Sequence, residues 1–149
     1  MNADLLPAAA ICELASVSHS KYLKWLSLKV VRQPSAEGCS LTDCVELALA
    51  QTLAGHLARL EAIRTAMSQL VDGISVIPDV GSLDIVYEAR FGTARWITNS
   101  NDLAIFARRY RRILVVDVRS LVDDVRRGFA RRAADRSSRQ LRVVKSRTA

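Results

Sequence analysis

The sequence predicts an α+β protein, in which a helical N-terminal half precedes a small C-terminal domain with the element order ββαβα. From residue 8 to residue 70, apolar residues recur at three- and four-residue intervals, which is typical of amphipathic helices. After residue 82 the composition changes to short runs of β-branched and aromatic residues, separated by a turn and by helical patterns. The chain has 149 residues, which is long enough to bury a core, and half of these residues are hydrophobic.

The first two predicted helices are short and are joined by a tight turn. Apolar residues within 8–14 lie at helical spacing, and the run Ser16-Val17-Ser18 interrupts them. Ser18 is the expected N-cap of a second helix over residues 19–28, because its hydroxyl can accept a hydrogen bond from an unpaired backbone N–H. Two short helices around a tight turn form a helix-turn-helix pattern. The residues predicted on the inner face of the second helix are Tyr22, Leu23 and Leu26.

A long helical pattern follows a polar turn. Residues 33–40 contain a proline and a glycine and fit either a wing hairpin or a plain loop. Thr42 is expected to cap the next helix, with the carboxylate of Glu46 near its positive end. The apolar series then continues to residue 70. An expected break at Gly55-His56 divides it into two helices.

One motif spans the turn and the second helix. Val17-Ser18-x-Ser20 is followed by Lys24-Trp25-Leu26 and then by Val30-Val31. This motif resembles the DNA-binding helix of MerR-type and excisionase-type winged helix-turn-helix proteins, which typically reads V-S-x-S/T, then R-Y/W-L/I, then G-L-L/I/V. The likeness covers roughly residues 8–57, including the wing-like turn. Lys24 replaces the family's Arg, and Lys29 stands where the family usually has Gly.

The resemblance implies a winged helix-turn-helix domain in residues 1–57 and a linking or dimerisation helix in residues 58–72. The second helix would enter the major groove of double-stranded DNA, with Trp25 chiefly holding it in place and Arg32 touching the backbone or minor groove. Because the family dimerises through a helix in this position, the apolar stripe of residues 57–70 is an expected homodimer contact. The alternative is that this stripe packs on the chain's own C-terminal domain. The residues expected to bind DNA are Ser18, His19, Ser20, Lys21, Lys24, Trp25, Lys29 and Arg32.

Residues 73–134 are predicted to form the C-terminal α+β domain. It opens with a β-hairpin, in which the runs 83–89 and 94–98 are joined by a glycine-containing turn. No specific family is indicated by this part of the sequence.

The remaining elements of this domain are a helix, a strand and a last helix. Ser100 or Asn101 is expected to cap the first of these helices. Residues 113–118 form a nearly continuous apolar run, as expected of a central strand, and Ser120 is expected to cap the last helix. Residues 135–149 are predicted to be a disordered basic tail.

The formal net charge of +7 is unevenly distributed. Residues 1–70 hold six basic and six acidic side chains, although every charged residue between Glu13 and Glu37 is basic. From Arg108 onward there are fourteen basic and four acidic side chains. This C-terminal charge fits solvated helix faces, a phosphate-contacting surface, or the binding of an acidic protein partner.

Several classes of function are not indicated by the sequence. It contains no glycine-rich nucleotide motif, no P-loop and no GxSxG motif, so an enzyme is not expected, nor is a cofactor or a metal. Cys12, Cys39 and Cys44 are expected to be reduced thiols. The alternative is that Cys39 and Cys44, with His19 or His56, sense a metal or an oxidant. No apolar run is long enough to span a bilayer and no signal peptide is visible, so no membrane association and a cytoplasmic location are expected.

The resemblance and the basic strip together predict a sequence-specific DNA-binding transcriptional regulator that acts as a homodimer, with repression favoured over activation. Two alternatives remain. One is an excisionase-like architectural DNA-binding factor, and the other is an antitoxin-like protein whose C-terminal domain binds a protein partner.

Overall fold

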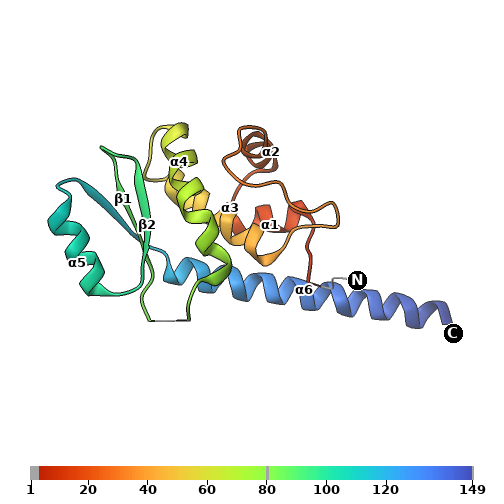
Figure 1. Ribbon diagram of the computed structural model, residues 1–149. Coiled ribbons are helices and arrows are strands. Elements are labelled where there is room, and N and C mark those ends of the chain that lie inside the picture. Colours follow the sequence, from red (N-terminus) through yellow and green to blue (C-terminus); the bar gives the residue numbers. More distant parts are fainter. Residues whose placement is uncertain (1–3, 80, 149) are drawn as a thin grey trace.

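The computed structural model describes residues 4–79 and 81–148, and these residues form a mixed α+β fold. Six α-helices, one 3₁₀ helix and a three-stranded antiparallel sheet make up the described chain. Figure 1 shows the sheet and α5 at one end, the helices α1 to α3 towards the other, and the long helix α6 running beneath both. The predicted α+β class is confirmed.

The first two helices, α1 (Ala8–Ala15) and α2 (His19–Ser27), both end in the same backbone geometry. Ser16 (φ +57°) and Lys29 (φ +58°) have left-handed conformations just after the two helices. The N–H of Val17 then donates to the carbonyl of Cys12 at 2.9 Å, and that of Val30 donates to the carbonyl of Trp25, also at 2.9 Å. These bonds close a Schellman motif at each helix end. The N-cap prediction for Ser18 is confirmed, since its Oγ accepts from the N–H of Lys21 at 3.2 Å.

The segment between α2 and α3 is a tight turn rather than a wing hairpin of two strands. The N–H of Gly38 donates to the carbonyl of Ser35 at 3.2 Å, and Cys39 pairs instead with Leu6 through two backbone bonds of 2.8 and 2.9 Å. Gly38 has a φ of +145°, and a Cβ there would lie 3.2 Å from the carbonyl oxygen of Leu6. Glycine is therefore required where this turn passes the N-terminal segment.

Helix α3 (Leu41–Ala54) is the central helix of the fold, and residues 44–50 are all buried. The prediction that Thr42 is its N-cap is wrong. Ser40 is the N-cap, because its extended backbone precedes the helix and its Oγ accepts from the N–H of Asp43 at 3.2 Å, while the Asp43 carboxylate accepts from the N–H of Ser40 at 2.7 Å. Glu46 does not face solvent near the helix end but is buried, with 2% of its surface exposed.

Helix α4 (Leu60–Leu70) and the 3₁₀ helix η1 (Val71–Val76) follow, so the predicted break at Gly55-His56 is confirmed. The apolar stripe of α4 lies against β2, α3 and η1 of the same chain. Its expected role as an exposed dimer face is therefore wrong, and the alternative packing on the chain's own core is the one observed. The stripe residues buried in this way are Ile63, Ala66, Met67 and Leu70.

The C-terminal elements β1 (Asp84–Glu88), β2 (Thr93–Ile97), α5 (Ser100–Arg109), β3 (Ile113–Asp117) and α6 (Arg119–Thr148) confirm the predicted ββαβα order. The strand order is β2-β1-β3, so β3 is an edge strand and its predicted central position is wrong. Strand β1 is central because it pairs antiparallel with both neighbours. The cap of α5 is also shifted from Ser100 or Asn101 to Asn99, whose Oδ1 accepts from the N–H of Asp102 at 2.8 Å.

Helix α6 continues far beyond its predicted end. It begins at Arg119, so Ser120 lies inside it, and residues 135–148 are helical rather than a disordered tail; Ala149 lies outside the described residues. No proline or glycine follows Gly128, and strong helix formers dominate this stretch. At Gly128 the helix passes close to α1, because a Cβ there would lie 2.7 Å from Leu14 Cδ2.

The main hydrophobic core crosses the predicted domain boundaries. Its buried residues extend from Leu6 to Ala133 and come from every α-helix except α5. A second, smaller cluster of Val86, Ile97 and Phe106 lies between the sheet and α5. Helix α6 thus connects the sheet to the N-terminal helices, and it packs on both α1 and α3.

Candidate nucleic-acid interface

Four of the eight side chains that the sequence predicts to contact DNA are exposed on α2 or just before it. Figure 1 shows α2 at the edge of the molecule opposite α6. Ser18, His19 and Ser20 are exposed around the start of the helix, and Lys24 is exposed one turn later. At about 100° per helical residue, Ser20 and Lys24 lie about 40° apart on one face. His19 lies about 140° from Lys24, and its ring centre is 6.4 Å from that of Tyr22. Ser18 Oγ and Ser20 Oγ lie 3.4 Å apart.

The inner face of α2 is anchored by two aromatic residues. Tyr22 is buried, and Trp25 is only 3% exposed, so Trp25 holds the helix on the core and does not present its ring to a ligand. Leu23 was predicted on this inner face and is 52% exposed instead. Each helical residue turns by about 100°, so Leu23 lies about 130° from the centre of a face built on Tyr22 and Trp25, on the outer side of the helix.

Lys21 is not free on the outer face. It is half-buried, and its Nζ donates to Gln51 Oε1 of α3 at 2.9 Å while lying 4.8 Å from the centre of the Trp25 ring. The Gln51 amide in turn donates to the carbonyl of Ser16 at 3.3 Å. The Lys21 cation thus ties α2 to α3 and to the turn, and its contact with DNA stays a prediction.

Arg32 is also held by the fold. Its backbone N–H donates to Glu46 Oε1 at 2.8 Å, and its Nε donates to Glu46 Oε2 at 3.0 Å. This ion pair explains the burial of Glu46, since a carboxylate leaves water at low cost only when its oxygens are paired. The Arg32 side chain nevertheless remains 53% exposed, so the ion pair leaves part of it open to solvent.

Two more cations lie at the C-terminal end of α2. Lys29 is exposed in its left-handed conformation. Arg64 of α4 was missed in the sequence, and its Nη1 donates to the carbonyl of Leu28 at 3.5 Å. Guanidinium groups near the last carbonyls of a helix complement its dipole. No local sequence pattern relates Arg64 to α2, because the two residues are 36 positions apart.

Burial disfavours the thiolate form of all three cysteines. Cys12, Cys39 and Cys44 are all buried. Burial raises the pKa of each thiol, and the pKa of Cys44 rises to about 12. Thiols with raised pKa values stay protonated, whereas nucleophiles and metal ligands are thiolates. Within the described residues, no group of three or more His, Cys, Asp and Glu side chains is placed to hold a metal ion.

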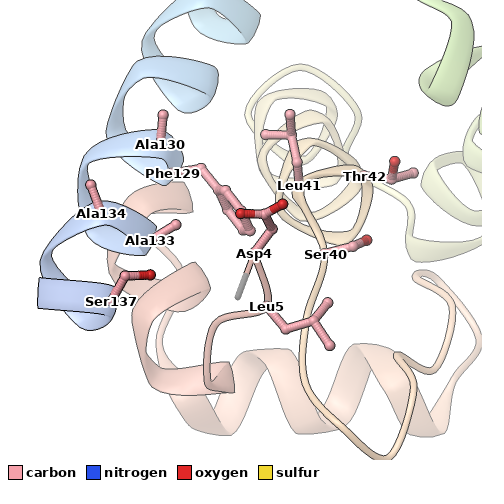
Figure 2. A pocket seen from close by; sticks show the side chains of 10 residues that line it. All are labelled: Asp4, Leu5, Ser40, Leu41, Thr42, Phe129, Ala130, Ala133, Ala134 and Ser137. Carbon is pink, nitrogen blue, oxygen red and sulfur yellow. The ribbon is translucent and has the colours of Figure 1, made fainter. Parts of the chain in front are cut away.

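A pocket of about 680 Å³ lies between the N-terminal segment, the start of α3 and α6. Figure 2 shows the Asp4 carboxylate between Phe129 and Leu41, with small side chains of α6 along one wall. The lining residues offer one carboxylate and three hydroxyls but no histidine, cysteine or lysine. The other lining residues are apolar, and a mostly apolar lining with a few polar groups is typical of small-molecule sites.

The described helices include none that is both long enough and apolar enough to cross a membrane. The chain matches no protein-family model, and no curated protein sequence matches it.

Proposed function

We propose that this protein is a sequence-specific DNA-binding regulator that reads the major groove with the outer face of α2, in the manner of a winged helix-turn-helix. The observation that carries the proposal is the pairing of a rigidly anchored inner face, built on Tyr22 and Trp25, with an outer face of Ser20, Lys24 and their neighbours. No acidic residue occurs between Glu13 and Glu37, so the polyanionic backbone meets no repulsion there.

In this proposal the contacts divide by position along α2. Ser18, His19 and Ser20 lie at the N-terminal end, which enters the groove first and reads base edges. Lys24 contacts a base edge or a phosphate one turn later. Arg32 and Arg64 flank the other end and contact phosphates, which fix the orientation of the helix but carry no sequence information.

The remaining parts of the proposal concern assembly and the form of regulation. We propose a homodimer on a repeated half-site, with repression by occupancy of the operator, and binding rather than catalysis as the protein's activity. The dimer contact would lie outside the apolar stripe of α4, since that stripe is buried within the chain. Half-sites would then be spaced by about 34 Å, one turn of B-DNA, or a multiple of it.

A binding titration on the DNA upstream of the protein's own gene tests the role of α2. The variant Ser20→Ala/Lys24→Ala removes two outer-face groups, and Arg95→Ala removes one exposed charge from β2 as the matched control. We expect the double variant to bind at least tenfold more weakly, with a slope of log affinity against log salt smaller by about 0.9 for each lost phosphate contact. The control should bind like the wild type. Equal affinity for the double variant and the wild type would refute the assignment of α2.

A second candidate is binding of a protein partner, as in an antitoxin. The last turns of α6 expose the apolar residues Leu141 and Val143 among basic side chains, which suits an acidic partner with an apolar contact. Co-expression with the product of the adjacent gene tests this function. We expect co-purification that Leu141→Ser abolishes, while DNA binding persists. Co-purification unaffected by Leu141→Ser would contradict a partner contact at the end of α6.

A further inference from the structure

A second pocket lies at the end of the sheet, away from α2 and α6. Its volume is about 700 Å³, and residues 88–91 and 109–112 line it. Antiparallel pairing of Glu88 with Ile113 brings the β1–β2 turn beside the segment that joins α5 to β3. Two short loops that are about 20 residues apart in the chain therefore form one concave site. A pocket of this size fits a small organic ligand.

This pocket is strongly electropositive. Four arginines line it, namely Arg90, Arg109, Arg111 and Arg112. Within residues 4–79 and 81–148, the ion pairs that form involve none of these four guanidinium groups. Four like charges around one cavity repel one another, and a bound anion relieves that repulsion.

The single carboxylate in the lining does not neutralise these arginines by ion pairing. Glu88 is buried, and its two oxygens accept from the backbone N–H groups of Arg90 at 3.1 Å and Phe91 at 2.7 Å. These bonds hold the β1–β2 turn in shape. The carboxylate therefore positions the turn, while the guanidinium groups of the pocket keep their donors for a ligand.

Aromatic side chains stand among the arginines. Phe91 is 66% exposed, and its ring centre lies 6.5 Å from that of Tyr110 at an interplanar angle of 65°. The guanidinium of Arg90 lies 5.3 Å from the Phe91 ring, and that of Arg109 lies 5.9 Å from the Tyr110 ring. An exposed phenylalanine beside guanidinium groups offers a flat surface on which a planar ring can stack.

We propose that this pocket binds a nucleotide, with its phosphates on the arginines of the 109–112 segment and its base stacked against Phe91. Guanidinium groups match phosphate oxygens in geometry and charge, and base stacking on an aromatic ring tolerates any base. The nucleotide is either a free nucleoside polyphosphate or part of a single strand. The proposal is independent of DNA recognition by α2, because no residue of α2 lines the pocket.

Titration calorimetry on the full chain tests the proposal with three probes: ATP, tripolyphosphate and a ten-nucleotide oligo(dT). Phe91→Ala should weaken ATP binding roughly tenfold through lost stacking and leave tripolyphosphate binding unchanged. Arg111→Ala/Arg112→Ala should weaken the binding of all three probes. Arg131→Ala removes an exposed charge of α6 and serves as the control, which should bind like the wild type. Circular dichroism checks that each variant is folded.

The comparison of probes separates the two sources of the nucleotide. Tighter binding of ATP supports a free nucleotide, and tighter binding of oligo(dT) supports a single strand. If neither ATP nor oligo(dT) shows saturable binding, the proposal is overturned. It is also overturned by tripolyphosphate that binds as tightly as ATP together with an unaffected Phe91→Ala variant, because the site would then recognise only negative charge.

Discussion

Lys29 has a left-handed backbone conformation, which costs free energy in any residue other than glycine. Its φ of +58° follows from the Schellman motif that ends α2, in which Lys29 occupies the position usually held by glycine. The left-handed conformation costs a non-glycine residue roughly 1–2 kcal/mol.

Replacing Lys29 tests this strain directly. We expect Lys29→Gly to raise the free energy of unfolding by about 0.5–1 kcal/mol, since part of the relief is offset by the greater entropy of glycine in the unfolded chain. Lys29→Ala also removes the charge but keeps the Cβ, so it separates the two effects. Urea unfolding measures both variants. A gain of equal size in Lys29→Ala would show that charge, not backbone strain, is responsible.

The buried thiols make stability depend on alkaline pH. The pKa of Cys44 rises from 9.0 to about 12 in the folded protein because burial disfavours the thiolate. Above pH 9 the unfolded chain therefore releases a proton that the folded chain keeps. The stabilisation is complete below pH 9 and is lost as the pH rises towards 12, by at most about 1.4 kcal/mol per pH unit for each such thiol.

Urea unfolding at several pH values checks this dependence. We expect the free energy of unfolding of the wild type to be steady between pH 7 and 8 and to fall between pH 9 and 10.5. In Cys44→Ala the starting stability is lower because a buried group is lost, but the fall with pH should be shallower. Identical pH dependence in the two proteins would contradict the assignment to Cys44.

At the scale of single elements, two lysines of α2 differ in role. Lys21 and Lys24 are one turn apart on the same helix. Lys21 is directed at Gln51 and the Trp25 ring, whereas Lys24 is exposed. The difference arises because Gln51 of α3 lies 2.9 Å from the Nζ of Lys21, whereas the side chain of Lys24 faces solvent.

The two lysines should therefore separate stability from DNA affinity. We expect Lys21→Ala to lower the free energy of unfolding by about 1 kcal/mol, the typical net value of a partly buried hydrogen bond. Lys24→Ala should change it by less than about 0.5 kcal/mol, as is usual for exposed positions. Thermal unfolding measures both. Equal destabilisation by the two substitutions would contradict the structural role given to Lys21.

At the scale of the whole molecule, α6 joins the two halves of the chain. Arg132 of α6 pairs with Glu13 of α1 at 2.6 Å, and Arg136 donates to the carbonyl of Leu5 at 2.6 Å. Phe129 of α6 is buried in the same core as Ile11 and Leu53. Because the sheet and the N-terminal helices share this core, neither half loses its packing without exposing apolar surface of the other.

This shared core predicts one cooperative unfolding transition, and two tryptophans report on it separately. Trp25 is buried in the N-terminal helices, and Trp96 of β2 donates from its Nε1 to the carbonyl of Leu70 at 2.9 Å. In Trp96→Phe and in Trp25→Phe, we expect the fluorescence midpoint in urea to coincide with that of far-UV circular dichroism. A fluorescence transition that precedes the other signal in either variant would indicate two independently folding halves.

Features with short-range causes were predictable. The first two helices, the cap at Ser18, the break after α3 and the ββαβα order all depend on residues within a few positions of one another. Errors at helix ends were small, as at Thr42 and Ser100, because several neighbouring residues were equally capable of capping. The prediction of a disordered tail over residues 135–149 was a larger error. The basic composition of this segment suggested disorder, but residues 135–148 continue a helix whose first half packs in the core.

What the sequence determined by itself is therefore the set of elements and the exposed polar face of α2. Only the tertiary structure decided which cations remain free, because Lys21 and Arg32 find partners 30 and 14 residues away. It also decided that the α4 stripe is buried, that β3 is an edge strand and that four arginines surround one pocket. Hydrophobic periodicity marks an apolar face but not its partner, since burial against any apolar surface is similarly favourable.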